Sequence, residues 1–326
     1  MKHSNEILIL AIRNFIRNEK DLVPLLMSLL NLGKQSVYRR LRNEIPFTFE
    51  EVMLLSSSIG FSVDEIVGQL NQNDEVAEKR NDSQLASQDL YLGSRYKVNQ
   101  LLEKMRKDKG STIIAATNKL PYIYTAAYEN LTKMEYYKWY HQRQEYFTEL
   151  TFSEFKMPSS IVSESKRIIY NGTLISKYTL LLDPNILKPI LKEISYYYER
   201  NMINDDELSV LQEELLQIVD ELEVLATTGH YKSGSEVNIY LSSLNIESNC
   251  ILLENENNTC FVIWINSTEP VTIFNHNICS VQKKWMLSLK KYSTLITQCN
   301  EFSRSIFFKK QRETIMKLKE ERVVYL

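Results

Sequence analysis

The sequence predicts a mainly α-helical protein with an α+β C-terminal part. Apolar residues recur at helical spacing over residues 4–70 and again from about residue 91 to 228. From Glu236 onward the apolar residues alternate with a period of two, which is typical of strands. These patterns predict a five-helix N-terminal domain, a helical middle region, and a small antiparallel sheet flanked by helices at the C-terminus.

Composition narrows the protein class before any motif is considered. The chain has 326 residues, which suggests two or three domains. It carries 39 Lys+Arg against 41 Asp+Glu, and this balance excludes a uniformly basic nucleic-acid coat but leaves room for a local basic patch. No run approaches the roughly 20 apolar residues of a membrane span, so we expect a cytoplasmic protein without membrane contact.

Residues 1–70 show the clearest helix signals. A first helix carries Ile7, Ala11 and Phe15, and a second is expected to begin near Asp21, its candidate N-cap. Gly33 then interrupts the pattern, and residues 34–43 resume it. Two capping boxes with hydrophobic staples follow, and they predict two further helices. Their residues are Thr48 and Glu51 with Phe47 and Val52, then Ser62 and Glu65 with Phe61 and Ile66.

The third helix concentrates positive charge. Residues 34–43 contain four basic residues and no acidic one, whereas residues 1–70 contain eight of each. Val37 and Leu41 are expected to face the core. In the major groove of DNA, Arg pairs with guanine and Gln with adenine, while Lys, Ser and Tyr hold phosphates. On charge alone, a solvated basic helix is the more common explanation.

The order of elements favours the DNA-binding interpretation. LNLGKQSVYRRLRNEIPFTFEEVMLLSSSIGFSVDEIVG resembles the repressor-like (Cro/C1-type, XRE-like) helix-turn-helix family over about residues 5–70. The resemblance implies a homodimer on double-stranded DNA. Two departures are Gly33, where the family often has a Ser or Thr cap, and the four-residue spacing between Val37 and Leu41. By position, the implied DNA-binding residues are Lys34, Gln35, Ser36, Tyr38, Arg39 and Arg42.

The middle of the chain is expected to hold a linker and a helical region. Residues 71–89 have only two large apolar residues and predict a flexible linker. Residues 90–230 are predicted to be helical and to contribute to dimerisation. Leucines and an isoleucine between Leu208 and Leu225 follow spacings of three and four. This seam fits either a dimer interface or the core of its own domain.

Residues 231–326 are predicted to form an α+β sensor or effector domain. A helix in which Ile278, Val281, Trp285 and Leu289 share a face follows the sheet, and a last helix covers 300–321. Phrases such as LPYIYTAAYENLTKMEYYKW resemble a group of uncharacterised bacterial regulators, and this resemblance implies no site residues. The expected strands are Val237–Leu244, Ile246–Glu254, Thr259–Ser267, Val271–Asn275 and a short one at Thr294–Thr297, with Asn255–Asn258 as a hairpin turn.

The sequence contains no motif that indicates catalysis, a metal or a cofactor. Four cysteines without a C-x-x-C pair predict reduced thiols. His141 and Glu145 lie four apart without a third ligand, so we expect a surface pair. An aromatic and basic cluster could stack nucleic-acid bases, but core packing is the more common role of such residues. It comprises Lys133, Tyr136, Tyr137, Lys138, Trp139, Tyr140 and Arg143.

These observations predict a bacterial transcriptional regulator that is not an enzyme. Its expected partners are double-stranded DNA, a second copy of the chain, and a small-molecule or protein effector of unknown identity. Two alternatives stay open: an antitoxin-like module that binds another protein, and an enzyme without a known motif in the C-terminal region. A cleft with perturbed ionisable groups would favour the enzyme.

Overall fold

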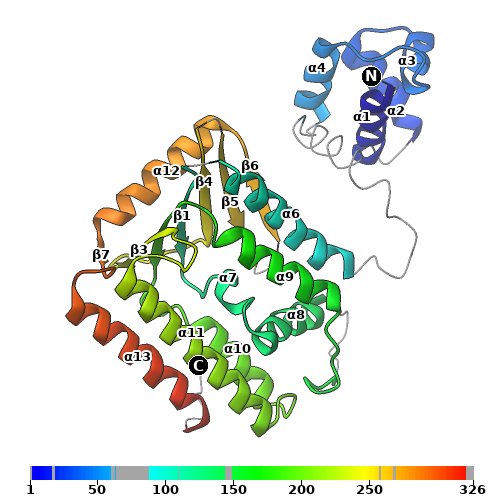
Figure 1. The fold of residues 1–326 in the computed structure, drawn as a ribbon. Helices are drawn as coiled ribbons and strands as arrows, with labels where there is room; N and C mark the ends of the chain where they lie inside the picture. Colours follow the sequence, from blue (N-terminus) through cyan, green and yellow to red (C-terminus); the bar gives the residue numbers. More distant parts are fainter. Residues whose placement is uncertain are drawn as a thin grey trace. The chain divides into compact units, whose positions relative to one another are not determined.

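The computed structural model describes residues 2–16, 19–59, 63, 88–108, 110–143, 149–256, 258–266 and 269–320. The chain divides into two compact units, Met1–Gln84 and Leu85–Leu326 (Figure 1). Residues 71–87 of the predicted linker lie outside the described residues, and so do Ser62 and Glu65 of the second predicted capping box.

The described part of the N-terminal unit is a helical bundle. Its helices are α1 (Lys2–Phe15), α2 (Glu19–Leu30), α3 (Lys34–Leu41) and α4 (Phe49–Ile59). Apolar side chains from all four meet in one core, because each helix carries an apolar stripe. The buried members of this core are Leu8, Ile9, Ile12, Leu22, Leu26, Val37, Leu41 and Leu55.

The start of α4 confirms one of the predicted capping boxes. Thr48 N donates to Glu51 Oε2 at 2.9 Å, and Glu51 N donates to Thr48 Oγ1 at 3.3 Å. The predicted second helix is present as α2, but Asp21 is not its N-cap: α2 already includes Glu19, so Asp21 lies inside its first turn.

Within the described residues, the C-terminal unit is built on one seven-stranded mixed sheet, in the order β6-β5-β4-β1-β2-β3-β7. The three adjacent strands β1, β2 and β3 are parallel. Antiparallel strands continue the sheet on both sides. The strands are β1 (Thr112–Thr117), β2 (Lys177–Leu182), β3 (Glu236–Ser242), β4 (Cys250–Glu254), β5 (Thr259–Trp264), β6 (Pro270–Ile273) and β7 (Ser293–Leu295).

Helices cover both faces of this sheet (Figure 1). The larger core contains Leu180 and Leu182 of β2, whereas the intervening Leu181 belongs to a second core beneath α12 (His276–Lys291). Successive residues of a strand point to opposite faces, so the two cores lie on opposite sides of the sheet. Helices on the larger core's side are α6 (Gln88–Arg106), α7 (Tyr122–Thr125), α8 (Glu129–Arg143), α9 (Ser159–Gly172), α10 (Lys188–Tyr198), α11 (Asp205–Thr228) and α13 (Glu301–Glu320).

The prediction of a small antiparallel sheet is therefore wrong. β1 and β2 come from residues 90–230, which were expected to be helical, and they pair in parallel in the middle of the sheet. Their sequences TIIAAT and KYTLLL are short apolar runs, and such runs do not alternate when both faces of a strand are covered. Residues 90–230 and 231–326 thus share one sheet and one compact unit.

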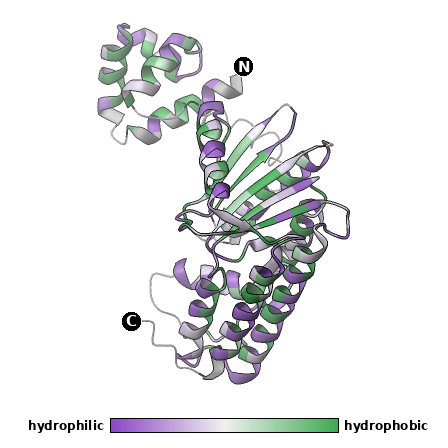
Figure 2. Cartoon of the chain, turned by 90° about the vertical axis from the view of Figure 1, so that its left-hand side faces the viewer, coloured by the Kyte–Doolittle hydropathy of each residue, from purple (hydrophilic) through white to green (hydrophobic). Residues whose placement is uncertain are grey.

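The seam on α11 belongs to the core of its own unit. Leu208, Leu211, Leu215 and Ile218 are fully buried, and Leu222 and Leu225 nearly so. The helix packs against α13, α8 and β3. Figure 2 shows the expected alternation of hydrophobic and hydrophilic residues along the helices below the sheet. Of the two interpretations of the seam, the internal one is confirmed.

Candidate functional site

Helix α3 is fixed to the N-terminal bundle by two apolar anchors. Val37 is 1% exposed and Leu41 is 9% exposed, and both belong to the core of the unit. The turn from α2 to α3 is short, and Asn31 adopts a positive φ of 51° in it. Gly33 is the N-cap residue of α3 in extended geometry, without a side-chain cap. The anchors leave the opposite face of α3 to solvent.

One arginine of α3 serves the structure of the bundle. Arg40 Nε donates to Glu51 Oε2 at 3.0 Å, and Arg40 Nη2 donates to Glu51 Oε1 at 2.7 Å. The two side chains are 12% and 16% exposed. This bidentate ion pair is largely shielded from solvent, and it connects α3 to the start of α4. The sequence interpretation left Arg40 out of the DNA-binding set but did not assign it this partner.

The residues predicted to bind DNA lie on the remaining surface of α3 and its C-cap. The side chains of Arg39 and Arg42 are 58% and 70% exposed. The Arg42 guanidinium lies 5.8 Å from the centre of the Tyr38 ring. Lys34, Gln35 and Tyr38 are exposed, and Ser36 is half-buried. One short helix therefore presents six polar side chains, three of them cationic, at one place on the bundle.

A carboxylate that the sequence interpretation did not consider lies beside this surface. Glu44 Oε2 is 3.4 Å from Arg39 Nε, and Glu44 Oε1 is 3.9 Å from Arg42 Nη1. Its position just after the basic run was the available signal, because the chain turns back on α3 there: Glu44 N donates to the carbonyl of Arg39 at 2.9 Å. The surface keeps three cations against one acid.

The other candidates from the sequence are structural. Tyr136, Tyr137 and Trp139 of the aromatic cluster are at most 4% exposed and pack in the larger core, so they are not free to stack on bases. His141 packs against the Tyr137 ring, and burial lowers its pKa. Its proposed neighbour Glu145 lies outside the described residues.

The cysteines and possible metal ligands add no further site within the described ranges. Cys250, Cys260 and Cys279 are buried and Cys299 is exposed, all as free thiols. Burial raises the pKa of Cys250 and of Cys260 to about 12 in each case, so both stay protonated. The described residues contain no group of three or more His, Cys, Asp or Glu side chains placed to hold a metal.

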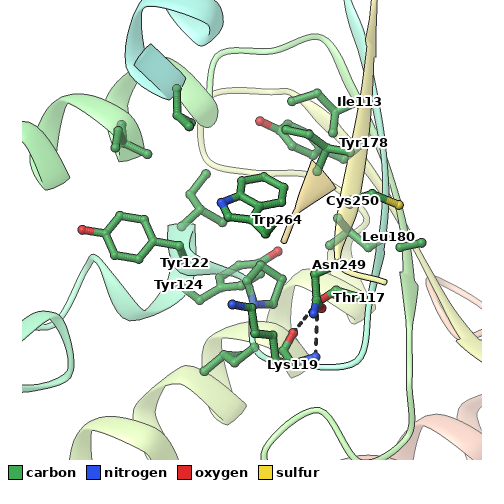
Figure 3. A pocket seen from close by; sticks show the side chains of 18 of the residues that line it. Ile113, Thr117, Lys119, Tyr122, Tyr124, Tyr178, Leu180, Asn249, Cys250 and Trp264 are labelled. Carbon is green, nitrogen blue, oxygen red and sulfur yellow. Dashed lines mark hydrogen bonds between the residues drawn. The ribbon is translucent and has the colours of Figure 1, made fainter. Parts of the chain in front are cut away.

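The C-terminal unit contains a cavity of about 130 Å³. It lies between the sheet and the segments α6 to α9, next to the end of β1 (Figure 3). No motif in the sequence indicated it, because its walls come from residues that are distant in the chain and mostly apolar.

Comparison of the chain with protein-family models, curated proteins and solved structures finds no match. Among the described residues, no helix combines the length and apolar character needed to cross a membrane.

Proposed function

We propose that the N-terminal unit binds double-stranded DNA in a sequence-specific manner and that the protein is a transcriptional regulator. The observation that carries this proposal is that one set of α3 residues holds the helix in the bundle while another set faces solvent. Val37, Arg40 and Leu41 hold the helix in place, while Arg39 and Arg42 extend into solvent beside Gln35 and Tyr38. A short helix held rigidly with such an outer face suits the major groove.

The side chains of α3 divide into two expected roles. Arg39, Arg42, Gln35 and Ser36 are assigned to the base edges, because their side chains carry the donor or acceptor groups that such contacts need. Lys34 at the N-terminal end of α3 and Tyr38 are assigned to phosphates, which position the helix without reading sequence. Glu44 holds Arg39 and Arg42 in the free protein and is expected to give way to phosphate.

The proposal extends to the whole chain. Repressor-like domains bind as pairs across a palindrome, so we expect a homodimer in the bacterial cytoplasm. The buried seam of α11 is not available as the dimer interface, because its leucines fill the core of their own unit. The C-terminal unit is assigned to dimerisation or to sensing an effector.

The test is selection of genomic DNA fragments by the full-length protein. An Arg39→Ala/Arg42→Ala variant is selected in parallel. The matched control is Lys166→Ala/Lys232→Ala, which removes the same charge from two exposed positions in the C-terminal unit. Recovery of one shared site by the wild type and the control, but not by the α3 variant, supports the proposal.

Two results would overturn it. Equal recovery by the α3 variant would show that α3 does not read DNA. If the folded wild type enriches no fragment and instead co-purifies with a stoichiometric protein, the antitoxin-like alternative becomes the better account.

A further inference from the structure

The cavity of the C-terminal unit has a largely apolar and aromatic wall. Its lining includes Tyr122, Tyr124, Tyr178 and Trp264, together with aliphatic side chains of α6, β1 and α9. Figure 3 shows these rings around a common space. An apolar cavity of about 150 Å³ accommodates a benzene ring. The cavity of the C-terminal unit, of about 130 Å³, therefore has room for an apolar group of about the size of a benzene ring.

One side of the cavity is polar. Thr117, Lys119 and Asn249 lie together there, where β1 ends and β4 begins (Figure 3). The Asn249 side-chain oxygen is satisfied, because Asn118 N donates to it at 3.0 Å and Thr117 Oγ1 at 2.6 Å. Its amide nitrogen donates no hydrogen bond to any described residue. A ligand at this place meets a free amide donor and an ammonium group.

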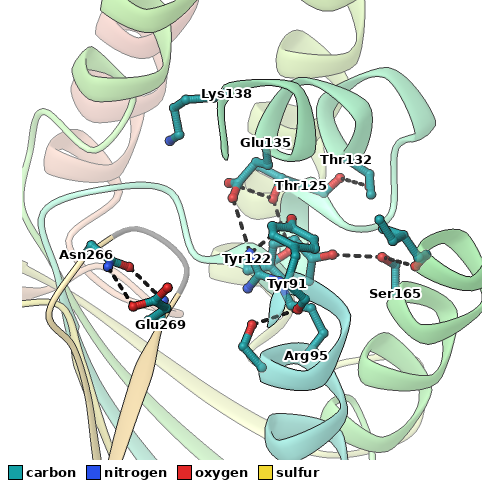
Figure 4. A network of polar contacts seen from close by, with 12 residues as sticks. Tyr91, Arg95, Tyr122, Thr125, Thr132, Glu135, Lys138, Ser165, Asn266 and Glu269 are labelled. Carbon is teal, nitrogen blue, oxygen red and sulfur yellow. Dashed lines mark hydrogen bonds and ion pairs between the residues drawn. The ribbon is translucent and has the colours of Figure 1, made fainter. Parts of the chain in front are cut away.

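A buried arginine adds to the positive charge of the cavity wall. Arg95 is 4% exposed, and its Nε atom has no hydrogen-bond partner among the described residues. Its guanidinium lies 3.7 Å from the centre of the Tyr122 ring and pairs with Glu135 at 3.6 Å (Figure 4). The Tyr122 hydroxyl is in turn fixed by Ser165 Oγ at 2.8 Å. The wall is thus already ordered without a ligand.

The charges decide the class of ligand. Two cations, Arg95 and Lys119, and one carboxylate, Glu135, line the cavity, so the charged groups of its lining sum to a net positive charge. Burial lowers the pKa of Lys119; the carboxylates of Glu135 and Glu193 raise it, and the nearby cations Lys138 and Arg95 lower it. An anion would relieve this local excess of positive charge, and a cation would increase it.

From these observations we propose that the cavity binds a small monocarboxylic acid with an apolar body, its carboxylate accepting hydrogen bonds from Lys119 and Asn249. The apolar body lies against the aromatic rings. This site is independent of the DNA-binding surface of α3, and its test requires no DNA.

The experiment is calorimetric titration of the full-length protein with benzoate, hexanoate, benzyl alcohol and benzylamine. Benzoate and hexanoate cover a flat and a flexible apolar body, and the other two probes replace the acid by a neutral and a cationic group. We expect at least one acid to bind with a Kd at or below about 1 mM, the alcohol more weakly, and the amine not measurably.

Variants locate the binding site. Lys119→Met is expected to weaken binding of the acid about ten-fold or more, since it removes a charged donor and keeps the length of the side chain. Lys166→Met on the exposed face of α9 is the matched control and should leave binding unchanged. Ala115→Ile fills part of the cavity and should abolish binding, with melting temperature reporting whether the variant folds.

Three results would overturn the proposal. They are failure of both acids to bind the wild type, binding of the alcohol or amine as tightly as the acids, and unchanged acid binding by folded Lys119→Met. The Lys119→Met comparison keeps the test decisive if Ala115→Ile does not fold.

Discussion

Gly33 shows how one residue limits the stability of helix α3. It occupies the N-cap of α3 with φ −67° and ψ 153°, a conformation that any residue adopts, and a Cβ built there meets no atom within 4 Å. The backbone N–H groups of the first turn therefore lack the side-chain acceptor that Ser supplies.

We expect Gly33→Ser to raise the free energy of unfolding by about 0.3–1 kcal/mol, through the new cap and a less flexible unfolded chain. Urea denaturation measures this change in the free energy of unfolding. Gly229→Ser is the contrasting control, because Gly229 has a φ of 77° and a Cβ there would approach Gln298 to 2.8 Å. Destabilisation by Gly33→Ser would contradict the described geometry of the α3 N-cap.

Individual residues of the α3 surface could be predicted because helical spacing determines which side chains share a face. Val37 and Leu41 are buried as expected. The pairing of Arg40 with Glu51 was not predictable, since it depends on where α4 lies in space. The cavity in the C-terminal unit was missed for the same reason: Lys119 and Asn249 are 130 positions apart in the sequence and meet only through the pairing of β1 with β4.

At the scale of elements, α11 provides a direct test of the internal seam. Leu215 is fully buried, whereas Val224 on the same helix is 61% exposed. We expect Leu215→Ala to lower the free energy of unfolding by about 2–5 kcal/mol, because it leaves a cavity in the core.

Val224→Ala is the matched control and should cost less than about 0.5 kcal/mol. Chemical denaturation gives both values. Equal small effects of the two substitutions, with a change of oligomeric state for Leu215→Ala alone, would show that the seam is a dimer interface after all.

Periodicity identified the strands on the C-terminal side but missed β1 and β2. β3 alternates between buried and more exposed residues from Glu236 to Tyr240, whereas β5 is an apolar run with three successive buried residues. Asn255 with Asn258 closes the turn between β4 and β5 as expected. β1 and β2 are buried between two layers, so their apolar runs give the same signal as a short buried helix. In α12 the predicted apolar face is largely exposed: Leu289 is buried, but Ile278, Val281 and Trp285 are 43%, 61% and 37% exposed.

At the scale of the whole molecule, buried tyrosines predict sensitivity to alkaline pH. Burial raises the pKa of Tyr231 to about 12 and that of Tyr197 to about 12. An unfolded tyrosine has a pKa of about 10, so above that pH the folded state binds more protons than the unfolded state. The stability that these groups contribute is fully present below about pH 10 and is lost as the pH rises toward about 12.

We expect the free energy of unfolding to fall between about pH 9 and about pH 11, each such tyrosine contributing up to about 1.4 kcal/mol per pH unit above pH 10. Urea denaturation at the two pH values measures the loss. Tyr231→Phe should reduce the loss, and Tyr292→Phe should not, because Tyr292 is 57% exposed. Identical pH dependence of wild type and Tyr231→Phe would contradict the assignment.

Whether α3 reads DNA is decided by the affinity of the full-length protein for its selected DNA fragment, measured across salt concentrations and single base-pair changes. We expect Arg39→Ala and Arg42→Ala each to cost about 1–3 kcal/mol of binding free energy. A base-reading arginine loses discrimination at one base pair, whereas a phosphate-binding one weakens all sequences and lowers the salt dependence. Glu44→Gln should tighten binding by up to about five-fold, because it releases both arginines from a surface ion pair. Wild-type affinity and specificity in both arginine variants would contradict the claim that α3 reads DNA.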